Sequence, residues 1–217
     1  MRGGARVLMM TAKNKMEVLK MDIYKQFRDP KTGNVLQIVF DYWAQNPRRE
    51  YDCNVGKFAV RKSCKYADDE TNLDLEFCSR DDDEKALDAD KNIAAWLPVY
   101  VYDHSGVTMN TTGFYCPWDS GQIGYIVALR DDVKAIQPSW KIITKKRREI
   151  ILEWLRGEVE TYSAYMRGDV YGFQIVELSD PDDPDSGEIA DSCWGYYGDD
   201  GIQAIREEYP EFTEEMA

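Results

Sequence analysis

The sequence of 217 residues has little histidine, and its cysteines are scattered singly. It has one histidine and five cysteines, and no two cysteines form a Cys-x-x-Cys pair. A zinc site would need thiolates far apart in the sequence, so we predict no metal and no cofactor. Neither Gly-x-Gly-x-x-Gly nor Gly-Lys-Ser/Thr is present, which removes support for the common phosphate-binding loops.

Long hydrophobic runs are also missing. No apolar stretch approaches the roughly 20 residues that span a bilayer, and the apolar patch at residues 7–10 is too short for the core of a signal peptide. An odd number of singly placed cysteines is typical of reduced thiols. We therefore expect a cytosolic protein without membrane contact, preceded by a flexible basic leader over residues 1–18.

Charge is present in excess and is unevenly placed. The formal net charge is −13. Residues 67–90 hold 11 Asp and Glu against 2 Lys and Arg, and residues 177–217 hold 14 against 1. Residues 1–66 have the opposite balance, with 14 basic and 6 acidic side chains. Such a field attracts basic proteins and repels phosphate, so we expect no direct nucleic-acid binding by the acidic half.

Turn residues and apolar patterning predict strands joined as hairpins. Residues 21–27 and 34–43 predict one hairpin, with its turn at "RDPKTG". Residues 121–129 are nearly all apolar, which indicates a strand in the centre of a sheet. Residues 130–136 predict a short helix that Pro138 stops.

The clearest helical pattern covers residues 145–166. Its apolar residues share one face at helical spacing: Ile151, Leu152, Leu155, Val159, Tyr162 and Met166. The sequence therefore predicts an α+β fold with one long amphipathic helix packed on a mainly antiparallel sheet. We expect a single domain over 19–209, with an acidic loop at 67–92 and a fraying acidic tail over 210–217.

His104 follows a predicted strand in "VYDHSG" and is the candidate general base. Cys116 or Cys193 would be its nucleophile, with Asp119 or Asp191 to orient it. No local signature of a cysteine hydrolase accompanies these residues, and cysteines in apolar strands are usually inert. A small cysteine-dependent hydrolase or transferase is the alternative hypothesis, and a non-enzymatic protein is favoured.

Two stretches share the same ingredients: "CPWDSGQIG" and "DSCWGYYG". They predict glycine-dependent turns, in which Gly121 supplies a positive φ and Gly124 lets a backbone or a ring approach closely. Trp118 and Trp194 are either core anchors, which we favour, or hot spots that contact a partner.

The acidic blocks suit either a solvated surface or mimicry of nucleic-acid phosphates. DNA carries one charge per roughly 1.7 Å of axis, so a mimic needs many closely set carboxylates. The candidates for such a partner contact are Asp81, Asp82, Asp83, Glu84, Asp182, Asp183 and Asp185.

Four motifs in order, "YVYDHSG", "CPWDSGQIG", "EVETYSAYMRGDVYGF" and "DSCWGYYG", resemble a family of accessory proteins of bacteriophages, archaeal viruses and plasmids. The resemblance spans roughly residues 47–198. This chain departs from it near the start, where the family usually has a Pro-Arg-x-Trp-Asp-Asn-Leu-Gly-like stretch and this sequence has "PRREYDCNVGKF", with Tyr51 and Cys53 substituted. The histidine- and arginine-rich stretch that tends to follow is replaced by "RKSCKYADDE".

The resemblance implies a small accessory protein of a mobile element, expressed in the host cytosol. Acidic proteins of this kind often inhibit host defence nucleases, which suggests an anti-CRISPR or anti-restriction inhibitor. Its partner would be a host protein with a basic nucleic-acid-binding surface. A structural or regulatory phage protein is a further hypothesis.

Overall fold

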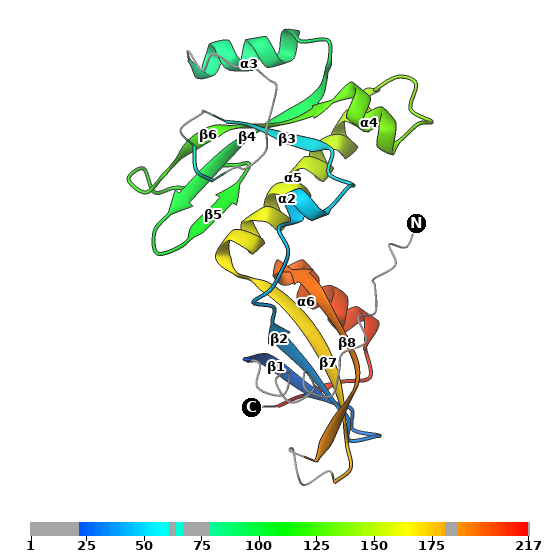
Figure 1. Cartoon of the computed structure of the whole chain (residues 1–217). Helices are drawn as coiled ribbons and strands as arrows, with labels where there is room; N and C mark the ends of the chain where they lie inside the picture. Colours follow the sequence, from blue (N-terminus) through cyan, green and yellow to red (C-terminus); the bar gives the residue numbers. More distant parts are fainter. Residues whose placement is uncertain (1–21, 61–63, 67–78, 181–185, 217) are drawn as a thin grey trace. The chain divides into compact units, whose positions relative to one another are not determined.

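The computed structural model describes residues 22–60, 64–66, 79–180 and 186–216 (Figure 1). Contacts divide the chain into two compact units, one from residues 1–44 and 168–217 and the other from 45–167, where the sequence predicted a single domain over 19–209. The predicted leader and residues 67–78 of the predicted acidic loop lie outside the described residues.

The first unit is an antiparallel sheet made from both ends of the chain. Its strands are β1 (Ile23–Arg28), β2 (Val35–Phe40), β7 (Val170–Leu178), β8 (Gly187–Tyr197) and β9 (Glu214–Met216). They are ordered β8-β7-β2-β1-β9, and every neighbouring pair is antiparallel. The predicted hairpin is thus confirmed as β1 and β2. The acidic tail, which we expected to fray, instead pairs with β1 through β9.

Helix α6 (Gly198–Glu208) supplies the apolar partner of this sheet. Ile205 of α6 is fully buried and clusters with Phe27, Leu36, Ile38 and Phe173 from the strands. Because side chains alternate along a strand, one face of each strand contributes to this cluster. The tail adds Phe212, which is 3% exposed and closes the same core.

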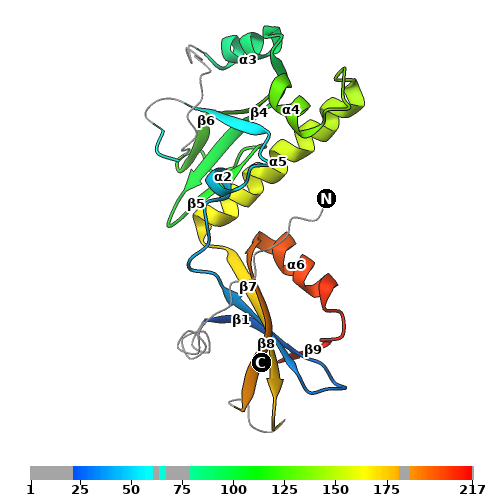
Figure 2. The same cartoon turned by 45° about the vertical axis from the view of Figure 1, so that its right-hand side comes forward.

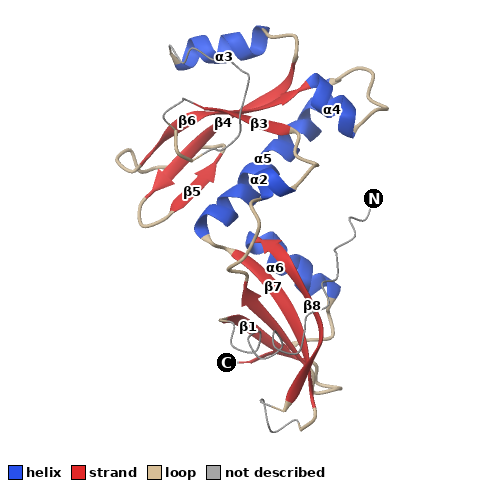
Figure 3. Cartoon of the chain, in the orientation of Figure 1, coloured by secondary structure: helices blue, strands red, loops and turns tan. Residues whose placement is uncertain are grey.

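The second unit contains a four-stranded sheet and the remaining helices (Figure 3). Its strands are β3 (Gly56–Val60), β4 (Ile93–Asp103), β5 (Val107–Asn110) and β6 (Ser120–Leu129), in the antiparallel order β3-β6-β4-β5. Its helices are α2 (Pro47–Glu50), α3 (Arg80–Ala89), α4 (Arg130–Ile136) and α5 (Lys145–Arg167).

Helices cover both faces of this sheet (Figure 2). Ile126 of β6 packs with Ile151 and Leu155 of α5, whereas Tyr125 and Val127 belong to a separate cluster with Leu87 of α3. Neighbouring residues of β6 therefore face opposite helices, which explains why its sequence is a continuous apolar run rather than an alternating one.

These elements confirm the α+β class and the predicted helices over 130–136 and 145–166, the second within one residue at its end. Where one sheet with one long helix was expected, the described residues form two antiparallel sheets and five helices. Part of the expected acidic loop at 67–92 is helix α3, because Ser79 caps the N-terminus by accepting a hydrogen bond from the Asp82 N–H.

The two glycines singled out in "CPWDSGQIG" have different outcomes. Gly124 has φ +156°, and a Cβ there would lie 2.3 Å from the Ala59 carbonyl oxygen, so the expected close backbone approach is confirmed. Gly121 is not among the glycines with positive φ, so that expectation is wrong. It lies inside β6, where its backbone is extended.

Candidate functional site

The acidic run of α3 is divided among local roles. Asp81, Asp82 and Asp83 occupy the first helical turn, where carboxylates interact favourably with the helix dipole. Asp83 is buried, and Glu84 forms an ion pair with Arg80 at 2.9 Å. Asp81 and Asp82 are exposed, and the Asp82 carboxylate accepts from the Ser79 hydroxyl at 2.7 Å and lies 3.9 Å from Lys85 Nζ. Asp182, Asp183 and Asp185 lie outside the described residues.

Cys193 and Trp194 lie in β8 of the first unit, whereas His104, Cys116 and Asp119 belong to the second. The Trp194 indole covers Gly172 of β7 so closely that a Cβ there would lie 2.2 Å from the ring. Trp194 is thus half-buried against its own sheet.

Cys193 has phenol groups as neighbours. Burial, together with the nearby Cys193 thiol, raises the pKa of Tyr196 well above its usual value. Burial and the Asp191 carboxylate raise the pKa of Tyr209 to about 12, and the Tyr209 hydroxyl donates to Asp191 at 3.2 Å. Both phenols therefore stay protonated at neutral pH and act as hydrogen-bond donors rather than bases.

The other three catalytic candidates do come together. The Cys116 thiol donates to Asp119 Oδ2 at 3.6 Å, and His104 Nδ1 lies 3.4 Å from the same oxygen. The carboxylate therefore lies between sulfur and imidazole. In a cysteine nucleophile the imidazole must contact the thiol to take its proton. The described residues contain no hydrogen bond between Cys116 and His104, and the His104 side chain is 63% exposed.

Residues 111–119, here called the aromatic loop, connect β5 to β6. The Asn110 side chain accepts from the N–H groups of Thr112 at 3.1 Å and Gly113 at 2.7 Å, and donates to the Gly113 carbonyl at 3.0 Å. At the other end, Ser120 Oγ donates to the Cys116 carbonyl. The loop is thus held at both ends by its own hydrogen bonds.

Two aromatic side chains extend from this braced loop into solvent. Trp118 is 90% exposed, and Tyr115 is fully exposed. The favoured prediction that Trp118 anchors the core is therefore wrong, because the loop between β5 and β6 presents this side chain to solvent. Tyr115 was missed by sequence reasoning, although its position beside Trp118 in "FYCPW" was an available signal.

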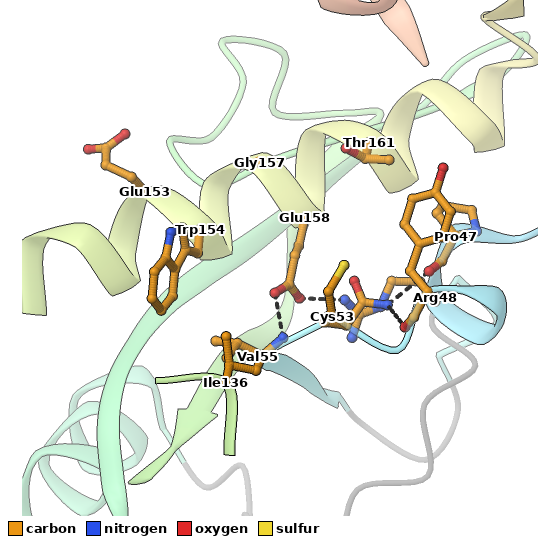
Figure 4. Close-up of a pocket in the computed structure, with 12 residues that line it drawn as sticks. Pro47, Arg48, Cys53, Val55, Ile136, Glu153, Trp154, Gly157, Glu158 and Thr161 are labelled. Carbon is orange, nitrogen blue, oxygen red and sulfur yellow. Dashed lines mark hydrogen bonds and ion pairs between the residues drawn. The ribbon is translucent and has the colours of Figure 1, made fainter. Parts of the chain in front are cut away.

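A cavity of about 540 Å³, here called the α5 cavity, opens beside α5 within the second unit (Figure 4). One wall is the segment that enters β3, and it contributes Pro47, Arg48, Tyr51, Cys53, Asn54 and Val55. The opposite wall is α5, which contributes Glu153, Trp154, Gly157, Glu158 and Thr161 at helical spacing. Tyr51 and Cys53, where this chain departs from the phage-type pattern, thus line the cavity.

A buried ion pair joins the two walls. Arg48 Nη1 donates to Glu158 Oε2 at 2.6 Å, and their side chains are 3% and 12% exposed. Glu158 also accepts from the N–H groups of Val55 at 2.7 Å and Gly56 at 3.0 Å. The guanidinium also donates to the Gly56 carbonyl at 2.6 Å and lies over the Phe58 ring at 4.9 Å.

Burial decides the direction in which the pKa of Glu158 is shifted. Desolvation raises the pKa of Glu158 above its usual value, although the Val55 N–H and the Arg48 guanidinium act in the opposite direction. Because the carboxylate is engaged by main-chain donors and by Arg48, it fixes the segment 47–56 against α5 rather than presenting a free acid.

Gly157 forms part of the helical wall, between Glu153 and Thr161 (Figure 4). A Cβ at Gly157 would meet nothing within 4 Å beyond its chain neighbours and the helix's own backbone. Glycine inside a helix costs about 1 kcal/mol relative to alanine. No packing contact requires the absence of a side chain here, and the glycine leaves this part of the cavity wall without a side chain. A glycine within the helical pattern was the signal in the sequence.

The described residues contain no cluster of three or more His, Cys, Asp or Glu side chains that could hold a metal ion. Within the same ranges, no helix combines the length and apolar character needed to cross a bilayer. No family model, curated protein or solved structure matches this chain.

Proposed function

We propose that this chain is an accessory protein of a mobile element that binds a host protein through the aromatic loop and thereby inhibits a host defence nuclease, of the CRISPR or restriction type. The observation that carries the proposal is the exposure of Trp118 and Tyr115 on a braced loop. The defence target is suggested by the motif resemblance and by the acidic charge.

The aromatic loop has the features of a binding hot spot. Trp and Tyr side chains each bury ~150 Å² or more in an interface, and at about 25 cal/mol per Å² this contributes roughly 4 kcal/mol per ring before the costs of association. A loop that is already braced loses little conformational entropy on binding. Trp118 and Tyr115 are therefore well placed to anchor a partner.

Charge favours a basic partner. The chain carries a formal charge of −13, and Asp103 and Asp119 lie at the base of the aromatic loop, where the Asp103 N–H donates to the Asp119 carbonyl at 2.9 Å. Exposed Asp81 and Asp82 add negative charge on α3. A basic nucleic-acid-binding surface on a nuclease would complement this field, with carboxylates in place of phosphates.

The test is affinity capture from host lysate, followed by measurement of Kd and of nuclease activity with the purified partner. We expect one nucleic-acid-handling enzyme to be retained at low salt and lost at high salt, since screening weakens charge pairing. Trp118→Ala should weaken Kd by at least about 30-fold, which corresponds to the roughly 2 kcal/mol of a hot spot.

Trp43 provides the matched control, because it is another tryptophan that is 79% exposed but lies in the first unit. Trp43→Ala should retain the wild-type Kd. Equal Kd values for Trp118→Ala and wild type would contradict the role of the aromatic loop. Binding without any change in nuclease activity would instead contradict inhibition and favour a structural or regulatory role.

A further inference from the structure

The α5 cavity has the size and composition of a small-molecule site and is not used by the proposed protein contact. Its volume of about 540 Å³ lies within the range of ~300–1,000 Å³ typical of ligand pockets. Its lining is mostly apolar and includes a few polar groups, among them the Thr161 side chain. Gly157 leaves one wall bare, so a ligand can approach the backbone of α5 closely.

The charges around the cavity are already compensated. Glu158 is paired with Arg48 at 2.6 Å and with two main-chain N–H groups, and Glu153 is paired with Arg156 one turn along the same helix. A charged ligand would have to displace the buried Arg48–Glu158 pair or remain uncompensated in the partly desolvated part of the site, which is costly. The Glu153–Arg156 pair is exposed to solvent, so it adds little to this cost. The lining thus favours a neutral ligand.

The aromatic residues of the lining favour a planar ligand. Tyr51 and Trp154 both border the cavity. The Trp154 indole is held by stacking on Trp140, with ring centroids 5.5 Å apart and an interplanar angle of 13°, and Arg147 lies 5.2 Å from the Trp140 ring centroid. A ring held in this way offers a rigid surface for offset stacking or edge-to-face contact.

We propose that the α5 cavity binds a neutral aromatic small molecule, whose ring lies against Gly157 and contacts Tyr51 and Trp154. The exposed Cys53 thiol borders the same cavity, so a bound ring shields it. The cavity lining and the aromatic loop share no residue.

The experiment uses fluorinated indoles and follows binding by ¹⁹F NMR. 5-Fluoroindole is the neutral probe, 5-fluorotryptamine the cationic probe and 5-fluoroindole-2-carboxylate the anionic probe. We expect wild type to bind 5-fluoroindole at least about tenfold more tightly than either charged probe. Absence of binding of 5-fluoroindole at millimolar concentration, or equal binding of the three probes, would overturn the proposal.

A substitution at Gly157 locates the site. Gly157→Leu places an aliphatic side chain in the open space and should weaken binding of 5-fluoroindole at least about tenfold. Glu160→Leu adds the same side chain at an exposed position of α5 outside the lining and should leave the affinity unchanged. Unchanged binding in a folded Gly157→Leu variant, checked by circular dichroism, would place the probe elsewhere and overturn the assignment.

A second measurement needs no variant. Alkylation of Cys53 by N-ethylmaleimide, followed by peptide mass spectrometry, should slow in the presence of 5-fluoroindole, while alkylation of Cys116 and Cys193 in the same sample should not. An unaltered Cys53 rate at a saturating probe concentration would overturn the proposal even if the Gly157→Leu variant fails to fold.

Discussion

Glu158 and Asp119 are two carboxylates of the second unit that face cationic or ionisable partners, and they differ in their exposure to solvent. Glu158 is 12% exposed and meets Arg48 and the N–H groups of Val55 and Gly56. Asp119 is 40% exposed and meets His104 and Cys116 at 3.4 and 3.6 Å. The buried Glu158 carboxylate thus holds the segment entering β3 against α5, whereas the Asp119 carboxylate and its neighbours remain accessible to solvent.

The two carboxylates differ in how far their surroundings tolerate substitution. A buried charge that loses its partner cannot be rescued by water, so the Arg48–Glu158 pair constrains the sequence around it. An exposed carboxylate is rehydrated when its partner is removed, so the surface around Asp119 can change without loss of the fold. The aromatic loop lies in this second, permissive environment, as is usual for binding surfaces.

The largest effect is expected for Arg48→Ala. It leaves Glu158 buried without its guanidinium, and we expect the free energy of unfolding to fall by about 3–5 kcal/mol in urea denaturation. Arg156→Ala is the matched control, because it breaks the exposed pair with Glu153 on the same helix and should cost less than about 1 kcal/mol. Similar losses of the free energy of unfolding in the two variants would contradict the claim that the buried pair contributes more to stability than the exposed pair.

A smaller effect is expected in the pH dependence of stability. Burial raises the pKa of Glu158 in the folded state, so the native protein binds more protons than the unfolded chain over the interval between the two pKa values. The free energy of unfolding of wild type should therefore fall, relative to that of Glu158→Gln, as pH rises from about 4.5 through the folded pKa. Urea titrations of both proteins from pH 4 to 7 measure the difference between their free energies of unfolding. If the stability of wild type relative to Glu158→Gln rises with pH, the ion pair with Arg48 outweighs the burial of the carboxylate.

Gly157→Ala should change stability by about 1 kcal/mol in the favourable direction, because alanine is the better helix former and its Cβ meets no neighbour. Gly168→Ala is a control of opposite sign. Gly168 follows α5 with φ +78°, a conformation that costs an L-residue roughly 1–2 kcal/mol. Thermal unfolding distinguishes the two, and a destabilised Gly157→Ala variant would show that Gly157 serves packing after all.

The smallest effect is expected for His104→Ala. Its side chain is 63% exposed, so the free energy of unfolding should change by less than about 0.5 kcal/mol. Alkylation of Cys116 by iodoacetamide should proceed at the same rate in wild type and variant, because the thiol donates to Asp119 and not to the imidazole. Rapid alkylation that is lost in His104→Ala would support the cysteine-dependent enzyme instead.

Local patterns were sufficient for several elements. The helices α4 and α5 and the hairpin of β1 and β2 follow from periodicity and turn residues, which act between positions near one another in sequence. The close approach at Gly124 was also predictable, because a glycine inside an apolar strand commonly marks it. Neither the partition of strands between sheets nor the exposure of Trp118 has such a local signature.

In the candidate site, too, residue types could be chosen from the sequence, but their arrangement in space could not. His104, Cys116 and Asp119 could be chosen by residue type, and the structure brings them together, but their order in space differs from that of a cysteine nucleophile and its base. Arg48 and Glu158 are separated by 110 positions. No pattern in a single sequence links them, because the contact depends on how the segment entering β3 meets α5.

The hydrophobic pattern was enough to predict the α+β class, a helix over 145–166 and the central apolar strand, since the period of that pattern indicates which side chains a helix or strand buries. The tertiary structure alone decided that the strands form two sheets in two units, that Trp118 faces solvent and that Gly157 borders a cavity. These features depend on strand pairing and burial between distant segments, which local periodicity does not encode.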